Sequence, residues 1–241
     1  MLTLKKVEPW KKAVEAISCF INEGNFRFND DGVSLKATDP SQVVLVNFLM
    51  QKTAFDKFEL EPNFVGLDIN ELNKIISRAL PNDRLLIKLS DNEMKLNLEG
   101  DISRSFALPL LDVSEEEIKM PSQEFDASVE INARILKEAL KDASLFGSSV
   151  VLRVKEGQLS IEARGSSGTL HSVAKQQPKA IAIKSNGEVV SKYSLTFLQN
   201  IVKEAEADQK VLLQLKNDAP MRVSYKIGPA QIEFYLAHMI L

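Results

Sequence analysis

The sequence matches itself when it is shifted by 126 positions. Repeats of about 20 to 50 residues predict a solenoid, whereas a period this long predicts two whole domains of similar fold, each with its own core. The register does not slip from one end of the match to the other. Identical residues coincide at Ala13 with Ala139, Phe20 with Phe146, Ala37 with Ala163, Leu72 with Leu198, Ile75 with Ile201, Leu86 with Leu212 and Leu89 with Leu215.

The same offset predicts the domain boundaries. The last residue, Leu241, corresponds to Glu115, so the first copy ends there. We therefore expect an N-terminal domain over residues 1–115, a connector over 116–126 and a C-terminal domain over 127–241. The connector reads EEIKMPSQEFD, which is charged and contains a proline, as exposed interdomain segments commonly do.

Hydrophobic periodicity predicts four short helices. Apolar residues at helical spacing mark residues 9–21, 70–80 and 195–207, and a further helix follows Asn132, which we expect to be its N-cap. Most other segments alternate apolar and polar residues like half-buried strands, for example on both sides of the turn at 29–32. The sequence predicts an α+β fold of two similar domains, each with antiparallel sheet and two helices.

Composition excludes several classes of protein. Hydrophobic residues make up 44% and charged residues 26% of the 241, a mixture typical of globular proteins rather than disordered or collagen-like chains. Cys19 is the only cysteine, so an intramolecular disulfide and a cysteine-based zinc cluster are excluded, and secretion is not expected. The chain contains neither a signal peptide nor an apolar run of about 18 residues. We expect an intracellular protein without a membrane partner.

Recognisable catalytic motifs are absent from the sequence. His171 and His238 do not lie in a metal-binding spacing, and both are expected at the surface. Neither a Walker-type phosphate loop nor a Gly-x-Ser-x-Gly elbow occurs, and residues 165–168 are interpreted as a flexible loop. We expect a protein that is not an enzyme and that uses no cofactor or metal. An enzyme with a site of scattered residues is the less favoured alternative.

The polar faces of the expected helices are rich in basic side chains. A solvated face is the ordinary interpretation of such charges, which are mixed with five acidic residues. If the four helices share one side, however, the basic residues form a stripe that contacts phosphates without reading the base sequence. The net charge of −3 means that contact with DNA must depend on local charge. The basic residues are Lys11, Lys12, Lys74, Arg78, Arg134, Lys137, Lys141 and Lys203.

Three passages resemble a known family. Residues 32–46 read GVSLKATDPSQVVLV, residues 106–112 read FALPLLD, and residues 234–237 read FYLA. Together with the length and the duplication, they resemble the DNA sliding clamps of the proliferating cell nuclear antigen (PCNA) family, in the archaeal form especially. The resemblance covers nearly the whole chain. It implies a trimeric ring of two-domain subunits whose helices line a channel for duplex DNA, and a processivity factor in DNA replication and repair.

The resemblance also implies three sets of site residues. The DNA-facing set is Lys11, Lys12, Lys74, Arg78, Lys137, Lys141 and Lys203. A hydrophobic pocket for a short peptide of client enzymes comprises Gln42, Val43, Leu45, Ile118, Met120, Pro121, Pro220, Tyr235, Leu236, Ala237 and Ile240. Edge strands near 101–108 and 169–175 are expected to join subunits through Arg104, Ser105, Phe106, Leu170 and Ser172.

The partners implied by the resemblance are double-stranded DNA, other clamp subunits and replication enzymes. The DNA is bound without sequence preference, and the ring is a homotrimer or a heterotrimer. The enzymes are a clamp loader, DNA polymerase, flap endonuclease and DNA ligase. The implied location is the cytoplasm of an archaeon or the nucleus of a eukaryote. A checkpoint-type clamp subunit that signals DNA damage is the alternative function. His238 stands where the family usually has proline, which puts the pocket's shape and its choice of client in doubt.

Overall fold

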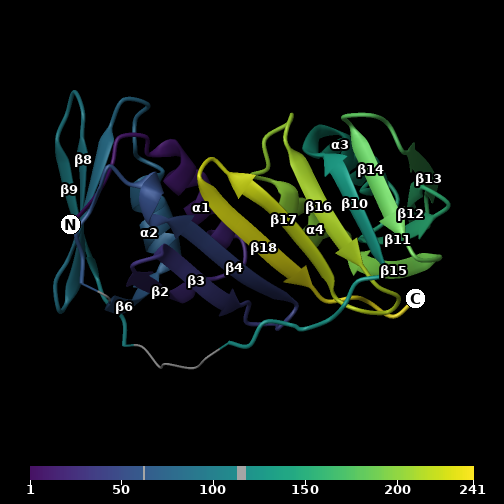
Figure 1. The fold of residues 1–241 in the computed structure, drawn as a ribbon, viewed down its shortest axis with the longest axis horizontal. Coiled ribbons are helices and arrows are strands. Elements are labelled where there is room, and N and C mark those ends of the chain that lie inside the picture. Colours follow the sequence, from purple (N-terminus) through teal and green to yellow (C-terminus); the bar gives the residue numbers. More distant parts are fainter. Residues whose placement is uncertain (62, 113–117) are drawn as a thin grey trace. The chain divides into compact units, whose positions relative to one another are not determined.

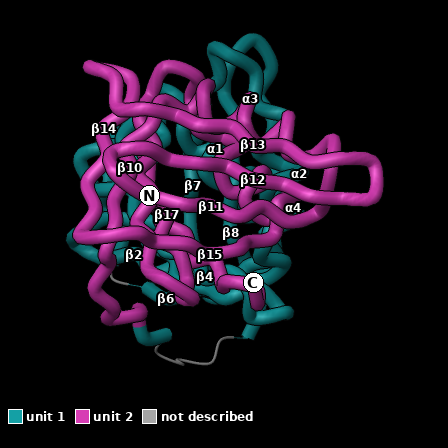
Figure 2. The backbone as a smooth tube through the Cα atoms, turned by 90° about the vertical axis from the view of Figure 1, so that its right-hand side faces the viewer, with its two compact units in different colours: residues 1–119, 226–232 teal, residues 120–225, 233–241 magenta. Residues whose placement is uncertain are grey.

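The backbone divides into two units (Figure 2). The computed structural model of the chain describes residues 1–61, 63–112 and 118–241. Unit 1 comprises residues 1–119 and 226–232, and unit 2 comprises residues 120–225 and 233–241. The predicted connector therefore contains the point at which the chain passes from unit 1 to unit 2. Its first two residues lie outside the described residues, and the predicted domain boundaries stay a prediction.

Unit 1 contains two groups of antiparallel strands and two helices that pack against each other, α1 (Glu8–Ser18) and α2 (Ile69–Ile76). A short 3-10 helix also occurs at Lys52–Ala54. One sheet has the order β5 (Lys57–Phe58), β1 (Leu2–Leu4), β7 (Arg84–Leu89), β8 (Glu93–Glu99) and β9 (Arg104–Pro109). The other strands pair in the order β4 (Val44–Gln51), β3 (Gly32–Thr38), β2 (Glu23–Asn29) and β6 (Asn63–Asp68).

Unit 2 repeats this architecture around α3 (Ala133–Ala143) and α4 (Leu195–Val202), which also pack together. Its four-stranded sheet has the order β13 (Gly168–Lys175), β12 (Gln158–Gly165), β11 (Ser149–Lys155) and β15 (Val189–Ser194). A second group pairs in the order β14 (Ile181–Ser185), β10 (Ala127–Asn132), β16 (Lys210–Leu215) and β17 (Met221–Ile227). These strands lie in front of α4 in Figure 1. The last strand is β18 (Ala230–Leu236).

The bounds of the elements repeat at the offset that the sequence predicts. A shift of 126 residues carries β2 onto β11, β6 onto β15, α2 onto α4 and β7 onto β16 with identical ends. Because the two copies share few identical residues, it is the pattern of apolar positions that preserves the fold. The α+β prediction, with two helices in each copy, is confirmed.

Local sequence explains where the helices begin. Asn132 caps α3, because its Oδ1 accepts a hydrogen bond of 3.0 Å from the amide of Arg134. Asp68 caps α2 in the same way, with a bond of 2.9 Å from the amide of Glu71. Helix α1 starts with Pro9 in its first turn, where a missing amide hydrogen costs nothing.

Three predicted helices were too long at their C-terminal ends. They end at Ser18, Ile76 and Val202 instead of at residues 21, 80 and 207. The chain tightens there into three-residue turns, in which Phe20, Ala79 and Ala205 donate to the carbonyl oxygen three residues earlier. Apolar periodicity continues through such turns and therefore does not locate the helix end. Ile75, Ala79, Ala139 and Phe197, which were expected to be buried, are half-buried.

A separate hydrophobic core lies between helices and sheet in each unit. In unit 1 the buried Trp10 of α1 packs against Phe26 and Phe48, with ring centroids 6.1 and 6.2 Å away. In unit 2 Leu136 and Leu198 are fully buried on α3 and α4. No helix among the described residues is both long and apolar enough to span a bilayer.

Candidate functional site

The predicted DNA-facing residues of unit 1 lie on its helix pair. Lys11 and Lys12 are half-buried on α1, whereas Lys74 on α2 and Arg78 in the following turn are exposed. The Nζ of Lys74 lies 2.5 Å from a carboxylate oxygen of Glu71. The hydrogen bond and the charge of Glu71 raise the pKa of Lys74, so this side chain stays protonated. All four basic groups are long side chains of the kind that reaches phosphate oxygens.

The lysines predicted in unit 2 surround one hollow between α3 and α4. It measures about 300 Å³, and its lining includes Lys137, Lys141 and Lys203, together with Leu140, Gln199 and Val202. The Nζ of Lys137 donates to the carbonyl oxygens of Lys203 (2.7 Å) and Ala205 (2.6 Å), which the end of α4 leaves without helical partners. Lys141 lies 2.7 Å from the carboxylate of Glu138. The structure thus brings these three lysines together.

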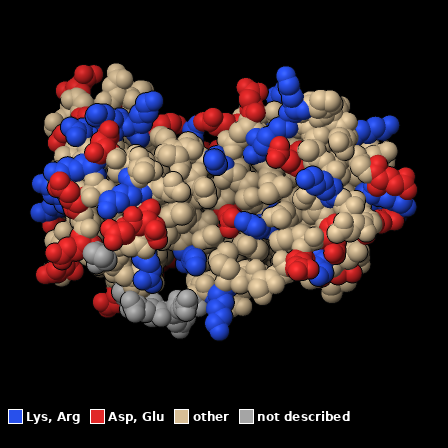
Figure 3. Space-filling view, in the orientation of Figure 1, with Lys and Arg blue, Asp and Glu red and all other residues tan. Residues whose placement is uncertain are grey.

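Charges of both signs are mixed on the sheet side (Figure 3). In Figure 3 Lys and Arg are interspersed with Asp and Glu over both units, and neither sign forms a continuous stripe. Mixed charges of this kind keep a surface solvated without attracting a polyanion. Within the bounds of the four helices, six basic residues accompany five acidic ones, so the excess of positive charge there is small.

In unit 1 the predicted pocket residues Gln42 and Val43 lie on the segment that joins β3 to β4, and Leu45 lies in β4 itself. Gln42 is exposed and has a φ of 58°, in the left-handed region, while Val43 and Leu45 are half-buried. Ile118, also half-buried, follows the undescribed residues 113–117.

Asp39 holds the bend of this segment. It is buried, and its Oδ1 accepts hydrogen bonds from the amides of Val43 (2.7 Å) and Val44 (2.6 Å), while Oδ2 accepts from the amide of Ser41 (3.1 Å). Burial raises the pKa of Asp39, but the hydrogen bonds from Ser41, Val44 and Val43 outweigh it and hold the pKa below its usual value. Sequence analysis did not assign this residue, although an aspartate followed by proline and serine is typical of such a turn.

The pocket residues of unit 2 differ in accessibility. Met120, Pro220 and Ala237 are half-buried, Pro121 is exposed, and Ile240 is 90% exposed. Tyr235 is 8% exposed to solvent, whereas Leu236 is fully buried and belongs to the core. The pocket as a whole combines residues of both units and stays a prediction.

Arg222 stands beside the ring of Tyr235. Its guanidinium carbon lies 6.0 Å from the ring centroid, at the outer limit of a cation–π contact. One of its nitrogens pairs with the carboxylate of Glu233, and another donates to Oε1 of Gln214 at 3.2 Å. Burial raises the pKa of Tyr235, so the phenol is neutral at pH 7. Gln214 and Glu233 thus hold the guanidinium of Arg222 beside the tyrosine ring.

The two strands predicted to join subunits each end a sheet. β9 is the last strand of its sheet in unit 1, and β13 is the last of the four-stranded sheet in unit 2. No described strand pairs with the outer side of β13. The opposite edge, β15, is covered by its own unit, because Asn217 accepts from the amide of Val190 (2.7 Å) and the amide of Met239 donates to the carbonyl of Lys192 (2.7 Å).

The predicted interface residues are only partly free for contact with another subunit. Ser105 is exposed, and Phe106, Leu170 and Ser172 are half-buried. Arg104 is engaged within its own unit: it pairs with the buried carboxylate of Asp83 and donates to the carbonyl of Arg78 at 2.7 Å. Arg104 therefore ties the start of β9 to the turn after α2, whatever it contacts in an assembly.

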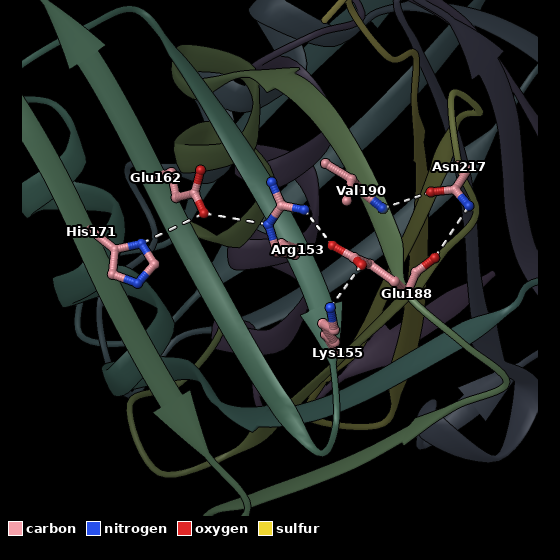
Figure 4. A network of polar contacts seen from close by, with 7 residues as sticks. All are labelled: Arg153, Lys155, Glu162, His171, Glu188, Val190 and Asn217. Atoms are coloured by element: carbon pink, nitrogen blue, oxygen red, sulfur yellow. Dashed lines mark hydrogen bonds and ion pairs between the residues drawn. The ribbon is translucent and has the colours of Figure 1, made fainter.

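A chain of ion pairs crosses the outer face of the four-stranded sheet (Figure 4). His171 lies 3.5 Å from Glu162, which also faces Arg153; Arg153 pairs with Glu188 at 2.5 Å, and Lys155 with Glu188 at 3.1 Å. Each carboxylate faces a basic side chain, and these side chains include no serine, threonine or cysteine. Within the described ranges no cluster of three metal-binding side chains occurs. Both histidines are exposed, as expected.

Comparisons with known proteins agree with the fold and with the resemblance. The family model of the PCNA N-terminal domain matches residues 2–117, and that of the C-terminal domain matches residues 119–240. The DNA polymerase sliding clamp 1 of Thermococcus kodakarensis is 30% identical over 228 residues, which cover 93% of this chain and 92% of the relative. The DNA polymerase sliding clamp of Pyrococcus furiosus is 29% identical over 240 residues, with 98% and 96% covered.

A solved structure supports the same assignment at the level of the fold. The crystal structure of PCNA from Thermococcus kodakaraensis superposes with a TM-score of 0.93 over 99% of both chains, at 23% sequence identity. Identity this low shows a shared fold and no more, but the family models and the relatives cover almost every residue. The chain belongs to the proliferating cell nuclear antigen family.

Proposed function

We propose that this chain is a subunit of a DNA sliding clamp, a processivity factor that keeps DNA polymerase on its template. The observation that carries the proposal is the match of both PCNA domain models to nearly the whole chain. Relatives of similar length bear the name DNA polymerase sliding clamp, and they are archaeal. A clamp acts by topology and therefore needs no catalytic group.

The proposed contact with DNA is electrostatic and without sequence preference. Lys11, Lys12, Lys74 and Arg78 on one helix pair, and Lys137, Lys141 and Lys203 on the other, contact the phosphates of a duplex that passes through the ring. Each contact is weak and flexible, so the duplex moves along the ring without meeting a fixed register. Lys74 and Lys141 pair with Glu71 and Glu138 in the free chain, and on DNA each pairs with a phosphate instead.

Ring closure and recruitment use the two other sets of residues. The edge of β9 in one subunit pairs with the open edge of β13 in the next, which satisfies backbone groups that an edge strand otherwise leaves to solvent. Client enzymes insert a short peptide into the apolar pocket near Tyr235. DNA polymerase is the proposed first client, and the clamp loader, flap endonuclease and DNA ligase are further ones. No observation favours the alternative of a checkpoint-type clamp.

Charge reversal on the helices tests the DNA contact. Lys11, Lys12, Lys137 and Lys141 are changed together to glutamate, and retention on a circular primed duplex is measured over a range of salt concentrations. We expect shorter retention, and a slope of log affinity against log salt that is smaller by about 0.9 for each phosphate that the variant no longer neutralises. Processive synthesis by an archaeal polymerase falls in parallel.

The matched control reverses four exposed lysines outside the helices, Lys36, Lys88, Lys184 and Lys226, which changes the net charge equally. This variant is expected to retain DNA better than the helix variant at every salt concentration. Equal loss in both variants would mean that total charge, and not the helix faces, determines retention.

A further inference from the structure

The turn that joins β16 to β17 has a backbone conformation that its own residues do not favour. It spans residues 216–220 and includes Pro220, one of the residues predicted to line the peptide pocket. Asp218 has a φ of 47°, a left-handed conformation that side chains other than glycine adopt only at some cost in energy. A turn of this kind keeps its shape only when surrounding groups hold it.

Two buried side chains of β15 hold this turn from inside unit 2. The Oγ of Ser191 donates to the carbonyl of Lys216 (2.8 Å) and accepts from the amide of Asp218 (3.0 Å). The Oη of Tyr193 donates to the carbonyl of Ala219 (3.1 Å). Ser191 and Tyr193 are both fully buried, and removal of either hydroxyl takes away hydrogen bonding to the backbone of the turn.

The turn is also bound at the edge of the sheet. The side chain of Asn217 accepts from the amide of Val190 (2.7 Å) and donates to the carbonyl of Glu188 (3.3 Å), as Figure 4 shows. Successive residues of the turn are therefore hydrogen-bonded to β15 and to Glu188, which directly precedes it. Burial raises the pKa of Tyr193 to about 12, so its hydroxyl keeps its proton and donates at neutral pH.

Two other segments with predicted pocket residues are attached to the same strand or turn. The Nε2 of Gln123, in the connector just after Met120 and Pro121, donates to the carbonyl of Pro220 at 2.6 Å. The amide of Met239, between Ala237 and Ile240, donates to the carbonyl of Lys192 on β15 at 2.7 Å. The connector is thus attached to the turn, and the C-terminal segment is attached to β15.

We propose that Ser191 and Tyr193 are positioning residues, which set the turn at 216–220 and through it the part of the peptide pocket that unit 2 supplies. The inference rests on the proposed function, because it assumes that this pocket binds client peptides. Neither side chain touches the peptide. Each acts by keeping Pro220 in place, and the carbonyl of Pro220 in turn holds the connector through Gln123.

Conservative variants with a matched control test this role. Tyr193→Phe and Ser191→Ala each remove one hydroxyl, and Tyr225→Phe removes the hydroxyl of another buried tyrosine, whose Oη donates to the carbonyl of Ile201 (2.7 Å) on α4 and not to the turn. The probe is a fluorescein-labelled synthetic peptide with a glutamine, an aliphatic residue and two aromatic residues. We expect about three- to tenfold weaker binding for Tyr193→Phe and Ser191→Ala, and a change below about twofold for Tyr225→Phe.

Hydrogen exchange supplies a second readout without any peptide. The amide of Asp218 donates to Ser191 in the wild-type chain, so it is expected to exchange faster in Tyr193→Phe and Ser191→Ala but not in Tyr225→Phe. Unchanged peptide affinity in both β15 variants would overturn the proposal, and so would equal weakening in all three variants, which indicates a general loss of stability.

If the chain does not bind client peptides in this pocket, the peptide-binding experiment gives a different result. Tyr235→Ala serves as the variant that removes a predicted pocket side chain directly. If the wild-type chain binds the peptide no better than Tyr235→Ala, the pocket assignment fails and the positioning role falls with it. Faster exchange at Asp218 in the β15 variants would then still show that Ser191 and Tyr193 hold the turn.

Discussion

Individual buried polar residues organise the segments that carry the predicted sites. Asp39 holds the bend that presents Gln42 and Val43, and Ser191 holds the turn that presents Pro220. Asp83, only 1% exposed, accepts from the amide of Leu80 (2.7 Å) and pairs with Arg104. In each case a buried side-chain oxygen makes two hydrogen bonds at once, and a satisfied buried polar group of this kind stabilises a fold.

Replacement of Asp39 tests this at the scale of one residue. Asp39→Ala leaves the amides of Val43 and Val44 without their acceptor, and we expect the free energy of unfolding at pH 7 to fall by about 2 kcal/mol. Asp31→Ala, at an exposed position in a neighbouring turn, is the control and should change it by less than about 0.5 kcal/mol. Urea unfolding measures both.

The same pair of variants predicts a dependence on pH. The pKa of Asp39 in the folded chain lies below its value of about 3.9 in an unfolded chain. Its contribution is therefore complete above about pH 4 and is lost as the pH falls through the folded pKa. The difference in stability between wild type and Asp39→Ala should shrink in acid. A difference that stays constant from pH 7 to pH 3 would contradict the role of the charged form.

At the scale of elements, the two edges of the four-stranded sheet in unit 2 differ in whether other segments of the chain cover them. The β15 edge is covered by Asn217 and Met239, whereas the described structure leaves the outer side of β13 open. A hollow of about 730 Å³ lies between β13 and α3, with Ile135, Ala139 and Ser172 in its lining. An open edge beside an apolar hollow is a surface that a further strand and its side chains can occupy.

Placing charge on the open edge tests whether it joins subunits. Leu170→Glu combined with Ser172→Glu puts two carboxylates on β13, and the one at position 172 joins Glu138 and Asp142 in the lining of the hollow. We expect the assembly to dissociate toward single chains, with circular dichroism unchanged. Val190→Glu, on the covered edge of the same sheet, is the control and should leave the assembly intact. The opposite result, with Val190→Glu alone disrupting it, would exclude β13 as the joining edge.

At the scale of the whole molecule, the proposal requires more than one chain. A single subunit cannot encircle DNA, and closed rings arise when a head-to-tail contact returns to its start. The chain itself has a mass of 26.9 kDa and a net charge of −3, so DNA binding depends on how an assembly concentrates the helix lysines.

Light scattering over a range of concentrations measures the mass of the assembly. A self-sufficient ring of three copies is expected at about 81 kDa. A mass of one chain that persists at high concentration would contradict a homotrimer and would indicate a ring completed by different subunits. Mixing with candidate partner chains then restores the higher mass.

The sequence predicted more of the fold than of the sites. The pattern of buried and exposed positions is local, and its repetition at an offset of 126 residues revealed the duplication. Capping residues such as Asn132 located the starts of helices. The sequence did not predict the helix ends at Ser18 and Val202, because apolar residues continue into the tighter turns that follow. The basic residues around α3 and α4 were predicted on one surface, and the three lysines of the shared hollow do lie together.

The sequence by itself determined that this chain has two copies of one α+β fold and a place in the PCNA family, because periodicity and motifs are properties of neighbouring residues. Only the tertiary structure decided which edge of the four-stranded sheet is covered by its own unit and what holds the turn at Pro220. Ser191 and Tyr193 are 25 or more residues from the groups they bind. Such contacts depend on how distant strands pair, and no spacing along the chain encodes them.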